Sequence, residues 1–247
     1  MKQSGAATLT LTAYEQIRNG ILEGTYPLGS PLTRRRLSEV LRMSPIPVAQ
    51  ALQRLEAEGF VESLPRVGTR VKVPSPAEVK GHYVVREALE AQAARLFAEK
   101  ATAAQRRQLL REATRLDRLF AEHFSGNAGG ELSRQVHLAH MNFHMRIAEA
   151  TGCEVLVQAI RNSQVLLFNW RYTLLRREPL PSGWHRQLAE VLAAGDIEEA
   201  DRAMRRHVRL SMEEVVQYFE ELAGVDEQGR LSYRGPQRRR RQPARFA

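Results

Sequence analysis

Four of the seven histidines are spaced so that they could share one metal ion. His140 and His144 are four residues apart, which places both side chains on one face of a helix. His185 precedes Gly195 by 10 residues and His207 follows it by 12. If Gly195 lies in the turn between two antiparallel helices, both side chains lie roughly 15 to 18 Å from that turn and can face each other. The four histidines therefore predict a site for one divalent transition metal inside a helical bundle.

Neutral imidazole nitrogens also restrict which metal is expected. They suit Zn, Ni, Cu or Fe better than Mg or Ca, and we expect Zn or Ni ahead of Mn. His137 lies on nearly the same helical face as His140, so either of the two could be the ligand. Any one of these histidines taken alone is an ordinary core or surface side chain. It is the spacing of the set that favours a metal.

The elements that would hold this site follow from apolar spacing downstream of a Pro-containing linker at residues 73–76. Residues 77–224 predict an antiparallel bundle of about six helices, with no strand after residue 74. Ser182 is expected to cap the fifth helix. The expected helices centre on residues 85–97, 109–120, 136–147, 155–175, 183–194 and 196–223.

Upstream of the linker, residues 8–74 have a different pattern. Apolar spacing predicts three helices, the last beginning at Pro45 with Ser44 as its N-cap and ending near Gly59. Residues 60–73 alternate as two short strands around a tip at residues 65–68. Three helices followed by a hairpin predict a winged helix-turn-helix, so the whole chain is expected to be mainly α-helical.

In a helix-turn-helix the third helix enters the major groove, and its first residues reach base edges. The candidates for base contact are Ser44, Ile46, Pro47, Gln50 and Arg54, and Gln50 could pair with an adenine edge. Phosphates are expected to pass near basic side chains of the second helix and the hairpin. These are Arg34, Arg35, Arg36, Arg42, Arg66 and Arg70.

Charge and composition agree with a nucleic-acid partner. Of the net charge of +9, residues 1–75 carry +4, residues 76–224 have no net charge and residues 225–247 carry +5. Residues 225–247 are therefore a basic tail, which is expected to be disordered. The longest run without Lys, Arg, Asp or Glu is the 12 residues Gln3–Tyr14, so neither a membrane span nor a signal peptide is expected. A single cysteine, Cys153, forms no internal disulfide and fits the cytoplasm.

Several short motifs between Tyr14 and Val73 occur together in one order: Ile21–Gly24, Pro27–Gly29, Leu37–Glu39, Ser44 with Pro47–Val48, Ala51–Val61 and Gly68–Thr69. In these motifs the chain resembles the DNA-binding domain of GntR-family transcriptional regulators. The helical remainder resembles the FCD effector-binding domain of the FadR-like branch. The two resemblances cover about nine-tenths of the chain and omit the basic tail.

The resemblance implies roles for individual residues of the DNA-binding domain. Arg35 matches an arginine that contacts DNA, and Gly68, followed by Thr69, matches a wing tip that approaches the minor groove. The family usually has arginine where this chain has Pro45 and Ala49, and glutamate where it has Gln50. Fewer base contacts of the family type are therefore expected.

For the helical domain the resemblance implies a ligand set and an effector. The family's metal ligands are an Asp-x-x-x-His pair and two later histidines. His144, His185 and His207 match the histidines, and His140 takes the acidic place. Arg86, with Glu90 four residues later, matches a pattern in which the arginine meets a carboxylate ligand; the alternative is an ordinary helical ion pair. Arg161 and Arg171 are further candidates for the effector pocket.

The leading hypothesis is a homodimeric regulator, with repression as the expected output, that binds a double-stranded DNA operator and responds to a small organic carboxylate. Two alternatives remain at this point. A metal-dependent helical hydrolase would use the histidines, but no His-Asp dipeptide or His-Glu-x-x-His motif occurs. A non-specific DNA-binding protein would use only the basic ends.

Overall fold

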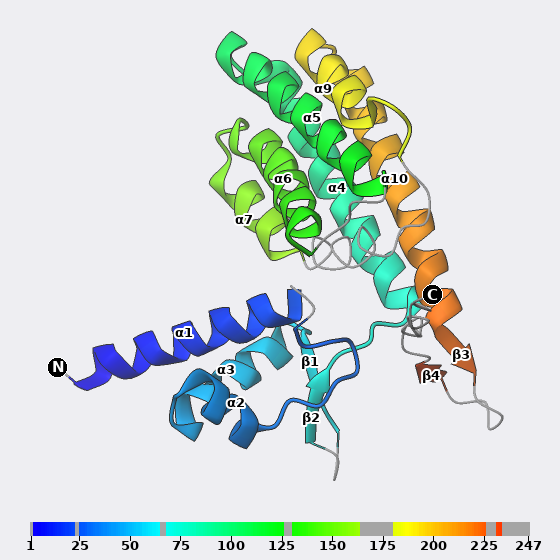
Figure 1. The fold of residues 1–247 in the computed structure, drawn as a ribbon. Helices are drawn as coiled ribbons and strands as arrows, with labels where there is room; N and C mark the ends of the chain where they lie inside the picture. Colours follow the sequence, from blue (N-terminus) through cyan, green and yellow to red (C-terminus); the bar gives the residue numbers. More distant parts are fainter. Residues whose placement is uncertain are drawn as a thin grey trace, which may run out of the picture.

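The structure is a computed structural model that describes residues 2–22, 25–64, 68–125, 130–163, 180–225 and 231–233. It is mainly helical, as predicted, with a winged helix-turn-helix followed by a bundle of helices (Figure 1). Among the described helices, none combines the length and apolarity needed to cross a bilayer.

The N-terminal domain contains three helices and a hairpin in the predicted order. Its elements are α1 (Lys2–Leu22), α2 (Arg34–Leu41), α3 (Pro45–Ala57), β1 (Val61–Leu64) and β2 (Gly68–Val71). α1 begins at Lys2, ahead of the expected start at residue 8, and packs against α3. The strands pair antiparallel, with Val61 opposite Val71 and Leu64 opposite Gly68.

Local sequence signals explain where α2 and α3 begin. The Thr33 side chain accepts a hydrogen bond from the amide of Arg36 and so caps α2. Arg42 then takes a left-handed conformation, with φ of 53°, which turns the chain toward α3. Ser44 occupies the N-cap position before Pro45, as predicted, although its hydroxyl makes no capping hydrogen bond.

The helical domain is built on two long helices that run antiparallel side by side, α4 (Pro76–Lys100) and α10 (Ile197–Leu222) (Figure 1). α5 packs against α6 and α9, and α6 packs against α4 and α7. The bounds of these four are Ala103–Phe124 for α5, Gly130–Glu149 for α6, Glu154–Asn162 for α7 and Trp184–Ala194 for α9.

Arg106 joins the ends of three helices in this domain. Its Nε donates to the carbonyl of Ala101, and its Nη2 donates to that of Ala98 at the end of α4. Nη1 donates to the carbonyls of Leu192 and Ala193 at the end of α9. One guanidinium on α5 therefore satisfies carbonyls that helix ends leave without partners.

Three local predictions for this domain are wrong. α7 ends at Asn162 and Ser163 is extended, so the helix expected over 155–175 is shorter; residues 164–179 lie outside the described ranges. The N-cap of α9 is Gly183, in a left-handed conformation, instead of Ser182. The prediction that no strand follows residue 74 is also wrong, because β3 (Ala223–Val225) pairs with β4 (Leu231–Tyr233).

Two of these differences have a physical reason in the structure. An acid on α5, described below, takes the first amides of α9, so that helix needs no serine cap. Three-residue strands such as β3 and β4 are too short to show alternation in the sequence. β4 also lies within the segment expected to be disordered, whereas Arg238–Arg241 lies outside the described residues.

Candidate functional site

Three of the four predicted histidines lie close together and are buried. His140 and His144 come from α6 and His207 from α10, and one ring nitrogen from each lies within 4.8 Å of the others. The Nε2 atoms of His140 and His144 are 3.0 Å apart. Helical spacing on α6 and the antiparallel docking of α10 thus bring together three nitrogen ligands of the kind that transition metals bind.

His185, the fourth predicted ligand, lies against these three histidines. It is buried near the start of α9, and its ring centroid is 5.2 Å from that of His140 and 5.3 Å from that of His207. His137 is buried one turn earlier on α6 and is not part of the cluster. The structure therefore places His140, and not its competitor His137, beside the other histidines.

Two carboxylates that the sequence did not assign to the site contact its imidazoles. Asp117 Oδ1 on α5 lies 2.8 Å from His185 Nδ1. Glu90 Oε2 on α4 lies 2.6 Å from His144 Nδ1, an ion-pair distance without hydrogen-bond alignment. A carboxylate on Nδ1 leaves Nε2 of the same ring available to a metal. We call His140, His144, His185 and His207 the histidine cluster.

Burial acts on the pKa of two imidazoles of this cluster. It lowers the pKa of His140 and of His207 well below the ordinary value, and the neighbouring histidines and Arg86 lower both further. Burial alone would raise the pKa of Glu90, but Arg86 and His144 outweigh it and lower that pKa to about 2. An ionised carboxylate thus belongs to the same buried network as the neutral rings of His140 and His207, whose lone pairs can bind a cation.

Arg86 is part of the same buried network. Its Nε donates to Glu90 Oε1 at 2.7 Å, so the pair expected on a helix surface is fully buried. Its Nη2 lies 3.4 Å from His144 Nε2. Its Nη1 is buried without a hydrogen-bond partner. A buried guanidinium with an unused donor has the chemistry to hydrogen-bond an anionic group.

The other two predicted effector residues are not placed at the cluster. The Arg161 side chain is half exposed at the end of α7 and lies 3.9 Å from Glu149. Arg171 lies outside the described residues.

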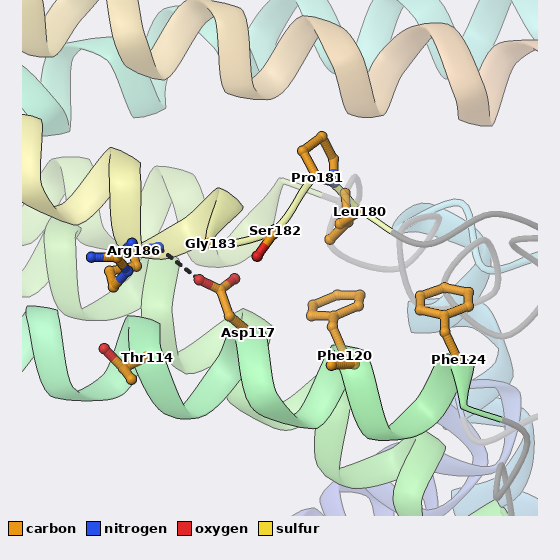
Figure 2. Close-up of a pocket in the computed structure, with 10 residues that line it drawn as sticks. Thr114, Asp117, Phe120, Phe124, Leu180, Pro181, Ser182, Gly183 and Arg186 are labelled. Atoms are coloured by element: carbon orange, nitrogen blue, oxygen red, sulfur yellow. Dashed lines mark hydrogen bonds between the residues drawn. The ribbon is translucent and has the colours of Figure 1, made fainter.

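A cavity of about 410 Å³ opens beside the histidine cluster, between α5 and the segment that precedes α9 (Figure 2). The rings of Phe120 and Phe124 and the carboxylate of Asp117 line it, with Leu180 opposite. Phe120 stacks on His185 at 5.2 Å, so this ring separates the cavity from the cluster. Asp117 contacts both the cavity and His185.

In the DNA-binding domain, the predicted phosphate contacts divide into free and paired arginines. Arg34, Arg36 and Arg42 are exposed and form no ion pair with described residues. Arg35 pairs with Glu39 at 3.1 Å, and Arg70 pairs with Glu62 at 2.7 Å. Arg66 lies outside the described ranges.

The base-reading face of α3 differs from the predicted one. Ser44 and Gln50 are exposed, as expected. Pro47 is buried with Ala51 in the core and cannot reach a base, because the docking of α3 on α1 turns this face inward. Gln53 is exposed on the outward face and was missed, although its position one turn after Gln50 is a usable signal.

Arg54 is exposed and also contacts α1. Its guanidinium lies 4.0 Å from the centroid of the Tyr14 ring, and its Nε donates to Glu58 at 3.0 Å. The side chain is therefore committed to the contact between α1 and α3. About half of the side chain, 53%, stays exposed, so the base contact of Arg54 stays a prediction.

The hairpin presents Gly68 at its tip. Its φ is +98°, a conformation that L-residues rarely adopt, and an added Cβ would meet nothing within 4 Å. The residue is exposed, and the Thr69 hydroxyl beside it lies 3.4 Å from that of Ser63. The backbone of the tip can thus approach a narrow groove closely.

Comparison with known proteins agrees with this architecture. Residues 9–71 match the family described as bacterial regulatory proteins, gntR family, and residues 82–210 match the FCD domain. The solved structure of Escherichia coli McbR/YncC superposes with a TM-score of 0.67 at 19% identity, covering 85% of this chain and 98% of that one. This structural likeness shows the fold.

Curated relatives are similar over most of their length. The transcriptional repressor RspR of Escherichia coli is 26% identical over 211 residues, covering 84% of this chain and 89% of the relative. A probable D-xylose utilization operon repressor of Paenarthrobacter nicotinovorans is 28% identical, covering 80% and 86%. These are regulators and not enzymes, which sets aside the hydrolase considered above. The chain belongs to the GntR family of DNA-binding transcriptional regulators, with an FCD domain as its ligand-responsive part.

Proposed function

We propose that this regulator is a homodimeric, cytoplasmic repressor whose affinity for its operator is set by a small organic carboxylate bound at a transition metal in the histidine cluster. DNA binding and regulation follow from the family. The metal, the effector class, the dimer and the sign of regulation are the proposal.

His207 is the observation that carries the metal. It is buried, and both of its ring nitrogens are without a hydrogen-bond partner in the described structure. A buried imidazole with no partner costs free energy unless something binds it. Since His140 and His144 present nitrogens within 4.8 Å, a metal ion accounts for the otherwise unfavourable position of His207.

The donor set favours particular metals. His140, His144 and His207 would hold the ion, and His185 lies close enough to complete the set. Imidazole ligands favour Zn or Ni over Mn, which prefers oxygen. When bound, the metal supplies a Lewis-acidic position that a carboxylate oxygen can take.

Arg86 supports an acidic effector. Its guanidinium lies beside His144, it is fully buried, and its Nη1 is free to donate. An organic carboxylate between the metal and Arg86 would receive a charge-assisted hydrogen bond. The effector changes DNA affinity only if it binds the DNA-bound and free conformations of the regulator unequally.

The metal is tested by elemental analysis of protein purified without chelator. We expect about one Zn or Ni per chain, lost in His144→Ala and His207→Ala, each with a lower melting temperature. His82→Ala is the matched control, because this half-buried histidine lies outside the cluster. Unchanged metal content in both cluster variants, with folding confirmed by circular dichroism, would show that the cluster binds no metal.

The effector is tested by a thermal-shift screen of small acids on the metal-loaded protein. Stabilising carboxylates should lose their effect in Arg86→Gln/Glu90→Gln, which removes both charges together and so leaves no uncompensated buried ion. Hits confined to neutral or cationic compounds would contradict the proposal. Added to the protein on its operator, a true effector should also change DNA affinity.

Dimerisation and repression have their own tests. One winged helix reads a half-site, so a near-palindromic operator requires two copies. Light scattering of the complex with DNA should give a protein mass, after the mass of the duplex is subtracted, of twice the 28.0 kDa chain mass. RspR and the D-xylose operon relative are named repressors, and a reporter behind the selected operator should likewise be less active when this regulator is present.

A further inference from the structure

Two side chains of α1 meet two side chains of α3 at matching heights. Thr10 and Tyr14 are four residues apart on α1, and Gln50 and Arg54 are four residues apart on α3. Thr10 contacts Gln50 and Tyr14 contacts Arg54. We call these four residues the α1–α3 ladder.

The contact between Tyr14 and Arg54 in this ladder helps to fix the position of the recognition helix. The Tyr14 hydroxyl donates to Glu58 Oε2 at 2.6 Å, and Arg54 Nε donates to the other oxygen of the same carboxylate. The Arg54 guanidinium packs over the Tyr14 ring. The two contacts of Tyr14, with Glu58 and with Arg54, therefore hold α3 against α1, and they help to set the exposed face of α3.

The contact between Thr10 and Gln50 acts on a side chain of the face expected to meet DNA. The Thr10 hydroxyl donates to Gln50 Oε1 at 2.7 Å. This hydrogen bond turns the amide oxygen toward Thr10 on α1, so the two N–H groups of Nε2 are directed away from α1. Gln50 is exposed on the first half of α3, where a recognition helix meets base edges.

This orientation matters because purines differ in their major-groove edges. Guanine presents two acceptors, N7 and O6, whereas adenine presents the acceptor N7 and the donor N6. A glutamine pairs with adenine by donating to N7 and accepting from N6, which requires the amide oxygen and nitrogen to face the base together. An amide whose oxygen is turned toward α1, and whose two N–H groups are directed away from α1, fits the two acceptors of guanine.

We propose that Thr10 is a specificity-determining residue that acts through Gln50, orienting its amide so that the regulator prefers guanine at one base pair of each half-site. This differs from the adenine contact expected from the sequence. It is independent of the metal and the effector, because it concerns the DNA-binding domain alone.

The experiment uses the full-length protein and measures base preference. Operator duplexes are selected from a random library with the wild-type protein. Every position of the half-site is then varied through four bases, and affinity is measured by fluorescence anisotropy. Gln50→Ala identifies the position that Gln50 reads, because discrimination there should be lost. We expect wild type to prefer guanine at that position by about 5- to 150-fold, the range for one good base contact.

The positioning role is tested by Thr10→Val, which keeps the shape of the side chain and removes the hydroxyl. With the amide oxygen released, the preference at that position should shift from guanine toward adenine by about tenfold, while the other positions keep theirs. Thr10→Ser should retain the guanine preference. The double variant Thr10→Val/Gln50→Ala should show no discrimination there, as Gln50→Ala alone does.

A matched control separates this role from a general effect on α1. Among the described residues, the Thr12 hydroxyl donates within its own helix, to the carbonyl of Thr8, so Thr12→Val should leave every base preference unchanged. A wild-type preference for adenine at the Gln50 position would overturn the inference. So would an unchanged preference in Thr10→Val, or a Gln50→Ala variant that discriminates at all positions as wild type does.

Discussion

Asp117 and His185 are joined by a 2.8 Å contact between Oδ1 and Nδ1 that crosses from α5 to α9. The same carboxylate accepts hydrogen bonds from the backbone amides of His185 and Arg186, each at 3.0 Å. Asp117 therefore supplies the cap that Gly183 cannot give α9, and it also orients an imidazole of the histidine cluster. The start of a helix and the geometry of the candidate metal centre depend on one side chain.

Asp117→Ala should lower metal affinity by about 10- to 100-fold, because His185 loses the partner that orients its ring. The matched control is Asp196→Ala, which removes a carboxylate that accepts from the amide of Glu199 at the start of α10 but contacts no histidine. Both variants should lose about 1 kcal/mol of stability with the lost cap. Titration against a competing chelator distinguishes them, and equal metal affinity in the two would contradict the role given to Asp117.

Stability should fall as the pH is lowered from about 6.5 to about 4. Burial lowers the pKa of His137 from 6.5 to about 4, so within this window the unfolded chain takes up a proton that the native protein does not. The contribution of His137 is complete above about pH 6.5, and about 3 kcal/mol of it is lost by pH 4. Urea unfolding across this range measures the slope. His137→Gln should make it shallower, and an identical slope in that variant would rule out His137 as its source.

Arg106→Met should lower the free energy of unfolding by about 2 kcal/mol, because the carbonyls of Ala98, Ala101, Leu192 and Ala193 lose their donor. The neighbouring Arg107 is exposed and forms no described ion pair, so Arg107→Met is a matched control that should change stability by less than about 0.5 kcal/mol. Denaturant unfolding of both variants gives the comparison. Similar losses in the two would mean that the carbonyl contacts of Arg106 contribute little.

Arg36→Gln should weaken binding to operator and scrambled DNA alike and reduce the slope of log affinity against log salt by about 1. This is expected because Arg36 is exposed on α2 without an ion pair to described residues. Arg111→Gln, an equally exposed change on α5, tests whether net charge alone explains the effect. Anisotropy titrations over a salt series provide the slopes. A loss confined to the operator would indicate a base contact instead.

The sequence was sufficient to predict the features that follow from the regular geometry of an α-helix. Because the rise per residue is constant, the distances of His185 and His207 from the turn at Gly195 could be calculated, and both side chains reach the cluster that contains His140 and His144. The order of helices and hairpin was also predictable from apolar spacing. These features depend on local periodicity, which the sequence displays directly.

Contacts between distant segments were not predictable in the same way. Asp117 and His185 are 68 residues apart, and no local pattern relates them. Pro47 and Arg54 were assigned to the DNA face, but their orientation depends on the rotation at which α3 docks on α1. Glu90 lay within a recognised helical pair with Arg86, yet only the packing of α4 against α6 shows that its carboxylate meets His144.

The α1–α3 ladder has a consequence for engineering chimeric regulators. Transplanting a recognition helix from one family member to another assumes that specificity resides in that helix alone. Here the amide of Gln50 is oriented by a residue 40 positions earlier, and Arg54 is held by Tyr14. A graft limited to residues 45–57 would place the donor's side chains on a host helix that orients them differently. A cassette that carries residues 8–22 together with 45–58 should transfer the donor's operator preference intact.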